Sequence, residues 1–361
     1  MAAARTALRR TAAPALATAA PGLARSMAIQ AKAVKFDKHG APGAVLSVVS
    51  ESVAEDIKAG EVLVRFLASP ISPNDLLDVE GWSGRKPGVA GNEGVAEVLQ
   101  AGSGVSGLKK GDWVVPARTG LGTWRTHAVF AAADLAALPS AGGKLPVEAA
   151  ATASVSPSVA LRLLADFVPL KKGDVIVQNN AASTVGQAVM QLAAARGIKT
   201  VNIMRMRDDY DDVVNHFHGL GATLVVDEDV ARTPAFGDLL KDLPAPKLGL
   251  NSVGGSAATA VAKALGHGGT MVTFGGMSRK PVTVPTSLLT GKDLTLRGFN
   301  LGAWLEAASA ADKEAMFAEA AKLAASNGAK QLLAREPFAD FAHALFRAQE
   351  PGERKVVLVF E

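Results

Sequence analysis

The stretch VIVQNNAASTVGQAVMQLAAARG, residues 175–197, decides the fold. It begins with β-branched residues, passes through a turn of small and polar residues, and ends in apolar residues at helical spacing. Strands that alternate with helices form right-handed βαβ units, so the sequence predicts an α/β fold with a doubly wound parallel sheet. The further strand patterns are TVNIMR (200–205), TLVVDE (223–228), KLGLNSV (247–253), GGTMVTFGG (268–276) and DLTLRGF (293–299).

The chain before this region has a different pattern. From Lys32 to about Ala137, short strands are separated by Gly, Pro, Asn and Asp, which indicates a mainly antiparallel β-domain. Its clearest strand patterns are EVLVRFLAS (61–69), GVAEVLQAG (94–102), DWVVPA (112–117) and WRTHAVF (124–130). Helical spacing is found at 147–167, at about 311–326 and at about 338–349, and the chain ends in a strand, KVVLVF (355–360).

The composition excludes several kinds of chemistry. The 361 residues contain no cysteine, which excludes disulfides, thiolate nucleophiles and cysteine-ligated zinc. They contain one tyrosine, Tyr210, so a mechanism that needs a phenol must use it. The six histidines show no metal-ligand spacing and no G-x-S-x-G elbow occurs, so neither a metal site nor an acyl-enzyme is indicated. No apolar run reaches the ~18–20 residues of a membrane span.

The basic charge is confined to the N-terminal segment. The net charge is +4, but residues 1–36 hold six of the 38 basic residues and no acidic one, which leaves 32 basic against 34 acidic residues. A nearly neutral body does not predict nucleic-acid binding. Residues 1–30, rich in Ala, Arg, Ser and Thr, are typical of a mitochondrial transit peptide cleaved near Arg25–Ser26; a disordered tail is the alternative.

The turn within 175–197 is a candidate nucleotide site, because a helix N-terminus attracts phosphate. It contains Ser183, Thr184, Val185 and Gly186, and Thr184 stands where a G-x-G-x-x-G motif has its middle glycine. The small residues before Thr184 still allow a narrow turn. An ordinary strand–helix turn is the alternative interpretation.

Two arginines follow the next strand. NAD enzymes place an acid there, whereas the guanidinium groups of Arg205 and Arg207 suit a ribose 2′-phosphate, which favours NADPH. Solvated charges at a strand end are the alternative. Later, FGGMSRK (274–280) follows a predicted strand, and Gly275 and Gly276 would let the backbone approach the nicotinamide half of the cofactor, unless they form a simple turn.

Longer motifs carry a family resemblance. They are ISPNDLL (71–77), GNEGVAEV (91–98), GSGVSGLKKGDWVVPARTGLGTWRTHAVF (102–130), VGQAVMQLAAARGIKTVNIMRMR (185–207), LNSVGG (250–255), GGTMVTFGGMS (268–278) and KDLTLRGF (292–299). With these motifs the chain resembles the medium-chain dehydrogenase/reductase superfamily, and within it the mitochondrial trans-2-enoyl-thioester reductases; GLGTWRT (120–126) is particularly diagnostic. Zinc-dependent relatives carry G-H-E where Gly91-Asn92-Glu93 stands, so the resemblance implies the zinc-free branch.

The resemblance implies a fold and an activity. The fold is a GroES-like catalytic domain, residues 31–155 and 300–361, around a Rossmann nucleotide-binding domain, residues 156–299. The activity is NADPH-dependent hydride transfer to the β-carbon of a trans-2-enoyl thioester, carried on CoA or acyl carrier protein, while a proton reaches the α-carbon. The resemblance also implies fatty-acid synthesis in the mitochondrial matrix and a homodimer.

The resemblance further implies site residues, some of which depart from the family pattern. Ser83 stands where the family has its active-site tyrosine, and Ser156 and Asn300 replace an asparagine at a helix start and a tryptophan after Gly-Phe. Ser83, Asn74 and Trp124 are expected at the catalytic centre. The cofactor is expected at Ser156, Ser183, Thr184, Val185, Gly186, Arg205, Arg207, Phe274, Gly275, Gly276, Met277, Phe299, Asn300 and Lys355.

Three functions remain open on these residues. The first is the NADPH-dependent enoyl-thioester reductase, in which Ser83 or a water molecule replaces the phenol. The second, motivated by the changed catalytic positions, is a structural or regulatory subunit of a larger mitochondrial assembly. The third is a zinc-free quinone or other enone reductase, which needs hydride delivery more than a particular tyrosine.

Overall fold

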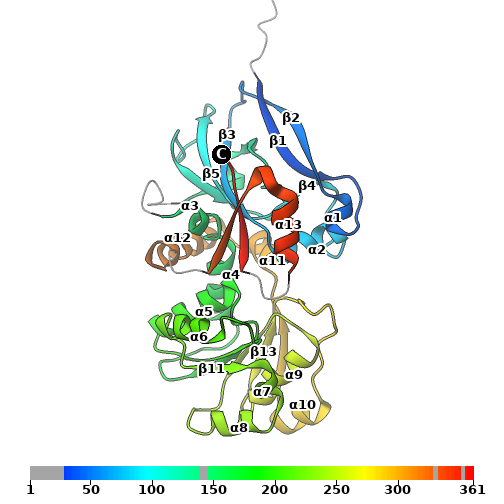
Figure 1. Ribbon diagram of the computed structural model, residues 1–361. Coiled ribbons are helices and arrows are strands. Elements are labelled where there is room, and N and C mark those ends of the chain that lie inside the picture. The colour runs from blue at the N-terminus through cyan, green and yellow to red at the C-terminus, as the bar shows by residue number, and fades with distance from the viewer. Residues whose placement is uncertain (1–27, 139–144, 328–331, 351–353) are drawn as a thin grey trace, which may run out of the picture.

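The computed structural model describes residues 28–138, 145–327, 332–350 and 354–361 (Figure 1). Most of the predicted transit peptide therefore lies outside the described residues. The first strand, β1 (Ala28–Phe36), already includes the last three residues of the predicted leader, and Ala28 pairs with Ala54. No helix of the described residues is long and apolar enough to cross a membrane.

The second half of the chain forms a six-stranded sheet. The strand order is β11-β10-β9-β12-β13-β14 and every pairing in it is parallel, which confirms the predicted doubly wound sheet. The chain leaves the central strand β9 first to one side and then returns to the other, so a topological switch point lies between β9 and β12. The strands are β9 (Val175–Gln178), β10 (Lys199–Met204), β11 (Leu224–Asp227), β12 (Leu248–Asn251), β13 (Thr270–Thr273) and β14 (Thr295–Gly298).

Helices cover both faces of this sheet, which explains why its central strands are largely apolar. In β9, Val175 and Val177 belong to one core cluster, with Phe236 and Val261 from helices on one face. Ile176 between them belongs to a second cluster, formed with helices of the other face. The helices of the chain are α1 (Pro42–Val45), α2 (Pro73–Glu80), α3 (Val147–Ala151), α4 (Val155–Leu163), α5 (Thr184–Ala195), α6 (Tyr210–Gly219), α7 (Glu228–Arg232), α8 (Ala235–Leu240), α9 (Gly255–Ala264), α10 (Thr286–Lys292), α11 (Leu301–Ala307), α12 (Ala310–Asn327) and α13 (Phe341–Gln349).

The first half of the chain forms the other lobe, at the top of Figure 1. One sheet has the order β15-β16-β3-β5-β6-β8 with β7 also paired to β3, and a smaller one has the order β2-β1-β4. All pairings except β15 with β16 are antiparallel, as predicted. The strands are β2 (Ser47–Ala54), β3 (Glu61–Pro70), β4 (Gly88–Val89), β5 (Val95–Ala101), β6 (Trp113–Pro116), β7 (His127–Ala131), β8 (Leu135–Ala137), β15 (Leu333–Pro337) and β16 (Lys355–Val359).

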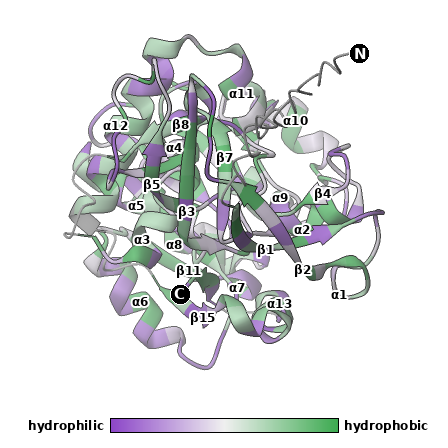
Figure 2. Cartoon of the chain, turned by 90° about the horizontal axis from the view of Figure 1, so that it is seen from above, coloured by the Kyte–Doolittle hydropathy of each residue, from purple (hydrophilic) through white to green (hydrophobic). Residues whose placement is uncertain are grey.

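The core of this lobe lies under its larger sheet. Strand β3 carries hydrophobic residues along much of its length (Figure 2). Phe66 of β3 is buried together with Trp124, Phe341 of α13 and Leu358 of β16. The C-terminal segment therefore completes the core of the N-terminal lobe. β7 starts later than the strand pattern at 124–130, because the backbone of Trp124 pairs with Val34 of β1 instead.

Within the part of the chain that the structure describes, two ion pairs connect the lobes. Arg279, in the loop after β13, lies 2.6 Å from Glu80 at the end of α2. Arg354, just before β16, lies 3.5 Å from Asp209, in the segment after β10. These contacts mark the junction at which the lobes face each other.

Candidate functional site

The carboxyl ends of the central parallel strands are held by two buried asparagines. The side-chain amide of Asn179, after β9, donates to Oδ1 of Asn251 at the end of β12 over 2.7 Å. Asn251 in turn donates to the hydroxyl of Thr273 in β13, and the backbone N–H of Ser252 donates to Asn179. These hydrogen bonds hold the carboxyl ends of β9, β12 and β13 together at the switch point, where nucleotides bind in open α/β sheets.

The turn between β9 and α5 has the geometry of an anion site. Ser183 caps α5 and accepts a hydrogen bond from the backbone N–H of Gly186. A side chain at Gly186 would collide with the backbone of Ala181, so glycine is needed for this close approach. Thr184 is buried, and its hydroxyl lies 2.8 Å from that of Ser156 in α4. The remaining backbone N–H groups of the first turn and the helix dipole favour phosphate there.

The predicted phosphate arginines lie in the segment that follows β10. Arg205 is exposed, and Arg207 forms a two-pronged ion pair with Asp209. This hydrogen bond is the first cause of the lowered pKa of Asp209, which Arg354 lowers further. The structure thus brings a third arginine, from the other lobe, to the two predicted ones.

The glycine pair lies in a loop fastened to the neighbouring strand end. The backbone N–H of Phe274 donates to Asn251 and that of Met277 donates to Ser252. Gly275 packs against the backbone of Ser252, whereas the space beside the α-carbon of Gly276 is open. Met277 is half exposed, at 50 %. An open glycine next to the strand ends leaves room for a flat ring to approach the backbone.

These features together fit a dinucleotide with a 2′-phosphate. The capped helix turn follows β9 and the open glycine follows β13, the two strands that flank β12, and cationic groups lie at the end of β10. The arginines supply forked donors, which match the planar geometry of phosphate oxygens.

Three other predicted cofactor residues have clear structural surroundings. Phe299, after β14, is half-buried and packs edge to face against Phe167. Asn300 accepts the backbone N–H of Ala303 and so caps α11, which is a structural task that the sequence did not predict. The ammonium group of Lys355 donates to the hydroxyl of Ser72 over 2.8 Å.

A pair of buried carboxyl groups lies beside Lys355. Burial raises the pKa of Glu93 to about 7 and that of Asp75 to about 6, although the charge of Lys355 opposes both shifts. Glu93 accepts the backbone N–H of Val155 over 2.7 Å, but its second oxygen is buried without a hydrogen-bond partner. Both groups can therefore hold or release a proton near neutral pH.

The three predicted catalytic residues do not form one cluster. Asn74 and Ser83 are exposed, at the start of α2 and in the loop after it, and the hydroxyl of Ser83 accepts the backbone N–H of Arg85. Trp124 is completely buried, packs against Phe341, and donates its indole N–H to Pro70. The only polar group of Trp124 is thus occupied inside the core, and its place at the catalytic centre stays a prediction.

Tyr210 does not compensate for the missing phenol at position 83. It begins α6 in the nucleotide-binding lobe, directly after the arginine segment, where its backbone N–H donates to the carbonyl of Arg207. Its pKa is raised, first by burial and then by the negative charge of Asp227. A phenol that holds its proton this tightly is a weaker acid.

The loop that contains Ser83 is closed by Arg85. The guanidinium of Arg85 donates to Asn92 over 3.3 Å, to Asp78 over 3.4 Å, and to the carbonyl groups of Val89 and Gly120. Both polar atoms of the Asn92 side-chain amide form hydrogen bonds. The oxygen accepts the backbone N–H of Gly120, and the amino group donates to Asp75 and Asp78. A buried polar network thus surrounds the position at which zinc-dependent relatives have a histidine.

The residues of this network do not fit a zinc ion. Among the residues that the structure describes, no group of three or more His, Cys, Asp and Glu side chains could hold a metal.

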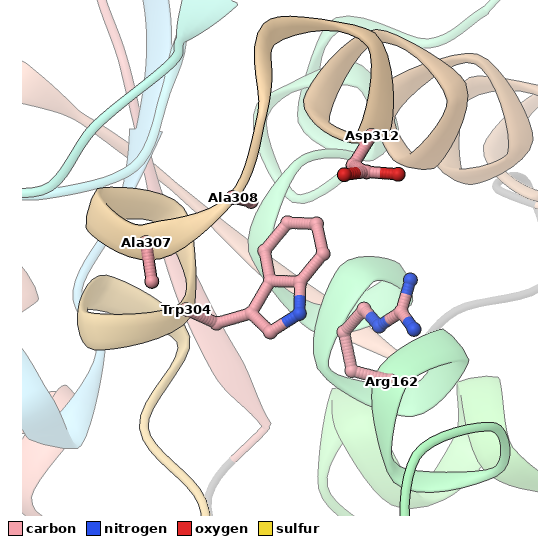
Figure 3. A pocket seen from close by; sticks show the side chains of 5 residues that line it. All are labelled: Arg162, Trp304, Ala307, Ala308 and Asp312. Atoms are coloured by element: carbon pink, nitrogen blue, oxygen red, sulfur yellow. The ribbon is translucent and has the colours of Figure 1, made fainter.

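One pocket lies apart from the strand ends. It has a volume of about 320 Å³ and lies between α4, α11 and α12 (Figure 3). Arg162, whose guanidinium is 4.8 Å from the ring centre of Trp304, lines it and is paired with Asp166. Arg162 is near the C-terminal end of α4, whereas Ser156 is at the other end. None of the predicted site residues lines this pocket.

Known proteins match this chain in both lobes. The family model "Alcohol dehydrogenase GroES-like domain" matches residues 58–140, and "Zinc-binding dehydrogenase" matches residues 184–316. The mitochondrial enoyl-[acyl-carrier-protein] reductase of Dictyostelium discoideum is 42% identical over 91% of this chain and 94% of its own length. The chain belongs to the mitochondrial enoyl-[acyl-carrier-protein] reductase family. The human member of this reductase family is 45% identical over 76% of this chain and 73% of its own length.

Solved structures of this reductase family support the same assignment. A complex of Etr1p with NADP and crotonyl-CoA is 32% identical, with a TM-score of 0.81, over 92% of this chain and all of Etr1p. The Etr1p/Etr2p heterodimer of Candida tropicalis, described as a mitochondrial 2-enoyl thioester reductase, matches equally well. The family and the fold predicted from the motifs are thereby confirmed. A putative NADPH:quinone reductase from Bacillus thuringiensis, at 24% identity, shares the fold.

Several polar residues near the candidate site were not predicted as site residues. Asp75 and Arg85 both bind Asn92, Glu93 lies close enough to Asp75 to feel its charge, and Arg354 pairs separately with Asp209. Glu93 gave one usable signal, because an acidic residue directly in front of the apolar strand that follows Gly94 is unusual. Arg85 gave none, since its partner Gly120 lies 35 residues away in sequence.

Proposed function

We propose that this protein reduces trans-2-enoyl thioesters with NADPH in mitochondria. The observation that carries the proposal is the set of cofactor-shaped features at the switch point of a chain that belongs to the reductase family. The neighbouring Etr1p structure holds NADP and crotonyl-CoA, so a short enoyl-CoA is the first substrate to test. The relatives named as reductases of enoyl-[acyl-carrier-protein] support the carrier-bound substrate as well.

The residues of this chain have separate tasks in the proposal. Ser183, Thr184, Val185 and Gly186 receive the pyrophosphate at the start of α5, and Arg205 and Arg207 bind the 2′-phosphate. Phe274, Gly275, Gly276, Met277 and Phe299 border the nicotinamide, with Ser156, Asn300 and Lys355 near it. NADPH supplies a hydride for the β-carbon of the substrate. Ser83 lies in an exposed loop, so water can reach the α-carbon side with the proton.

The experiment is a direct assay of the purified protein. NADPH oxidation is followed with crotonyl-CoA, with a medium-chain trans-2-enoyl-CoA, and with a quinone in parallel. We expect turnover of the thioesters and little of the quinone. NADPH binding without turnover of any thioester would contradict an enzymatic role and favour the structural or regulatory subunit. Reduction of the quinone faster than of the thioesters would favour the zinc-free quinone reductase.

We also propose a homodimer that pairs through β14. This strand is the edge of the parallel sheet, and all four of its residues are exposed, Leu296 at 43 %. An exposed edge strand offers unpaired backbone groups to a second copy. That Etr1p and Etr2p are described as a heterodimer supports pairing of such subunits.

The domain division stays a proposal. A catalytic domain of residues 31–155 and 300–361 and a nucleotide-binding domain of residues 156–299 agree with the return of β15 and β16 to the sheet of β3. Strand β1 extends the first of these segments to Ala28. The division is tested by expressing residues 156–299 alone and measuring whether the fragment folds and binds NADPH.

A further inference from the structure

A buried hydroxyl group lies at the switch point of the parallel sheet. Ser252 is the first residue after β12, the strand between β9 and β13, and only 6 % of it is exposed. Its hydroxyl oxygen is buried and has no hydrogen-bond partner among the described residues. A buried hydroxyl that forms no hydrogen bond costs free energy, and nearly all buried polar groups of native proteins are paired. The group therefore calls for a partner that the protein chain does not supply.

The backbone of Ser252 is held by the neighbouring strand ends on both sides. Its N–H donates to Oδ1 of Asn179, which follows β9, over 2.9 Å. Its carbonyl accepts the backbone N–H of Met277, in the loop after β13, over 3.0 Å. These two hydrogen bonds fix the α-carbon, so the side chain can change only by rotation about the Cα–Cβ bond.

The side chain of Ser252 faces the glycine loop after β13. A Cβ atom on Gly275 would lie 3.3 Å from the Cβ of Ser252. Because residue 275 is a glycine, no side chain stands between Ser252 and this loop. The space beside the next residue, Gly276, is open. The hydroxyl of Ser252 thus adjoins the part of the site that we assign to the nicotinamide half of the cofactor.

Ser158 in α4 provides a matched comparison. Its hydroxyl is likewise buried and has no hydrogen-bond partner in the part of the chain that the structure describes. Leu161, three residues later and on the same side of α4, packs with Phe317 of α12. Ser158 is therefore on the side of α4 that packs against another helix, whereas Ser252 is at the strand ends.

We propose that the hydroxyl of Ser252 donates a hydrogen bond to an oxygen of the nicotinamide nucleoside of NADPH, a ribose hydroxyl or the carboxamide. This inference rests on the cofactor of the proposed function and adds to the site a residue that the resemblance did not imply. Since the hydroxyl has no partner in the free protein, cofactor binding breaks no hydrogen bond within the chain. The new hydrogen bond therefore contributes to affinity without an opposing loss.

Nucleotide binding to matched variants tests the proposal. Ser252→Ala removes the hydroxyl with little change in volume. The loss of one neutral hydrogen bond should weaken NADPH binding about 3- to 10-fold, measured by calorimetric titration. The fragment 2′,5′-ADP has the 2′-phosphate but no nicotinamide, so it should bind Ser252→Ala and the wild-type protein equally. The control variant Ser158→Ala should bind both nucleotides as the wild-type protein does.

Thermal melting is the second measurement. Because the hydroxyl of Ser252 forms no hydrogen bond in the free protein, Ser252→Ala without nucleotide should melt no lower than the wild-type protein. The rise in Tm that NADPH causes should be smaller in this variant, since the rise follows the affinity. Ser252→Cys keeps a similar shape with a weaker donor, and its affinity for NADPH should lie between those of Ser252→Ala and the wild-type protein.

Three results would overturn the inference. The first is unchanged NADPH affinity in Ser252→Ala, and the second is an equal loss of affinity for NADPH and for 2′,5′-ADP, because neither agrees with a contact to the nicotinamide half. The third is a lower Tm of Ser252→Ala without nucleotide, which would mean that the hydroxyl already has a partner in the free protein.

The binding measurements separate this inference from the proposed function, because they do not depend on turnover. A loss confined to NADPH in a protein that reduces no thioester supports the inference and contradicts the reductase function. Thioester reduction by a protein whose NADPH affinity is unchanged in Ser252→Ala supports the function and contradicts the inference.

Discussion

The carboxylate of Glu93 accepts a hydrogen bond from the backbone N–H of Val155, 62 residues away and in the first turn of α4. This contact ties the strand region of one lobe to the helix that carries Ser156, whose hydroxyl reaches Thr184 at the cofactor turn. Since the other oxygen of Glu93 is buried without a partner, the protonation of this one group affects both the fold and the junction of the lobes.

The stability of the protein should depend on pH through Glu93. Burial raises its pKa to about 7 in the folded state, above the ordinary value of 4.5 that the group has in the unfolded chain. The folded protein therefore binds more protons than the unfolded chain between these values, and the free energy of unfolding falls as pH rises from about 4.5 to 7. Glu93→Gln should have a flatter dependence, measured as urea unfolding at pH 5, 6, 7 and 8.

The slope is the informative quantity in this experiment. Glutamine can still accept the N–H of Val155, and any cost of its buried amide is the same at every pH. Asp75, whose pKa is raised to about 6, leaves a smaller residual slope in the variant. Equal slopes for the wild-type protein and Glu93→Gln would show that Glu93 keeps an ordinary pKa.

Arg205 should discriminate NADPH from NADH. It is exposed beside the ion pair of Arg207 with Asp209, so its guanidinium is available to a 2′-phosphate. A charge-assisted hydrogen bond contributes about 1.5–3 kcal/mol, so Arg205→Gln should weaken NADPH binding about 10- to 100-fold and leave NADH unaffected. Calorimetric titration with both nucleotides measures this. Arg196→Gln, at the opposite end of α5, is the control, and equal losses for both nucleotides would refute the assignment.

Leu296→Glu should convert the proposed dimer into a monomer. The side chain of Leu296 is 43 % exposed on the edge strand β14. If two copies pair through β14, a glutamate at this position is buried in the interface, and the free-energy cost of burying its charge exceeds the stabilisation that the strand pairing contributes. Sedimentation velocity gives the oligomeric state. Val48→Glu places the same charge on an equally exposed residue of β2 and should leave the dimer intact. A variant at Leu296 that stays dimeric would place the interface elsewhere.

Trp124 should matter for stability and not for chemistry. Trp124→Phe removes the hydrogen bond to Pro70 and leaves space beside Phe341, which should cost about 2–3 kcal/mol. Chemical unfolding measures the loss, and kcat per folded molecule should not change. Trp82→Phe, at an exposed position, should alter neither quantity. A large fall in kcat for Trp124→Phe at unchanged stability would restore the catalytic role that the resemblance implied.

The sequence by itself determined the elements and the family. The spacing of apolar residues in 175–197 and in the strand and helix segments that follow it specifies the secondary structure locally. A strand that is buried on both faces is apolar at successive positions, whereas a helix with one apolar face has apolar residues at every third or fourth position. These local patterns were sufficient for the parallel sheet, for the turn at Ser183 and for the arginines after β10. The motifs were sufficient for the reductase family.

Only the tertiary structure decided which polar groups face one another. Arg85 meets Gly120, Arg354 meets Asp209, and Lys355 meets Ser72 across separations that no local pattern encodes. The same long-range packing buries Trp124 and raises the pKa of Glu93, because burial depends on what the rest of the chain places around a side chain. Periodicity along the chain therefore specified the fold, and the chemistry of the cleft was specified by contacts between residues distant in sequence.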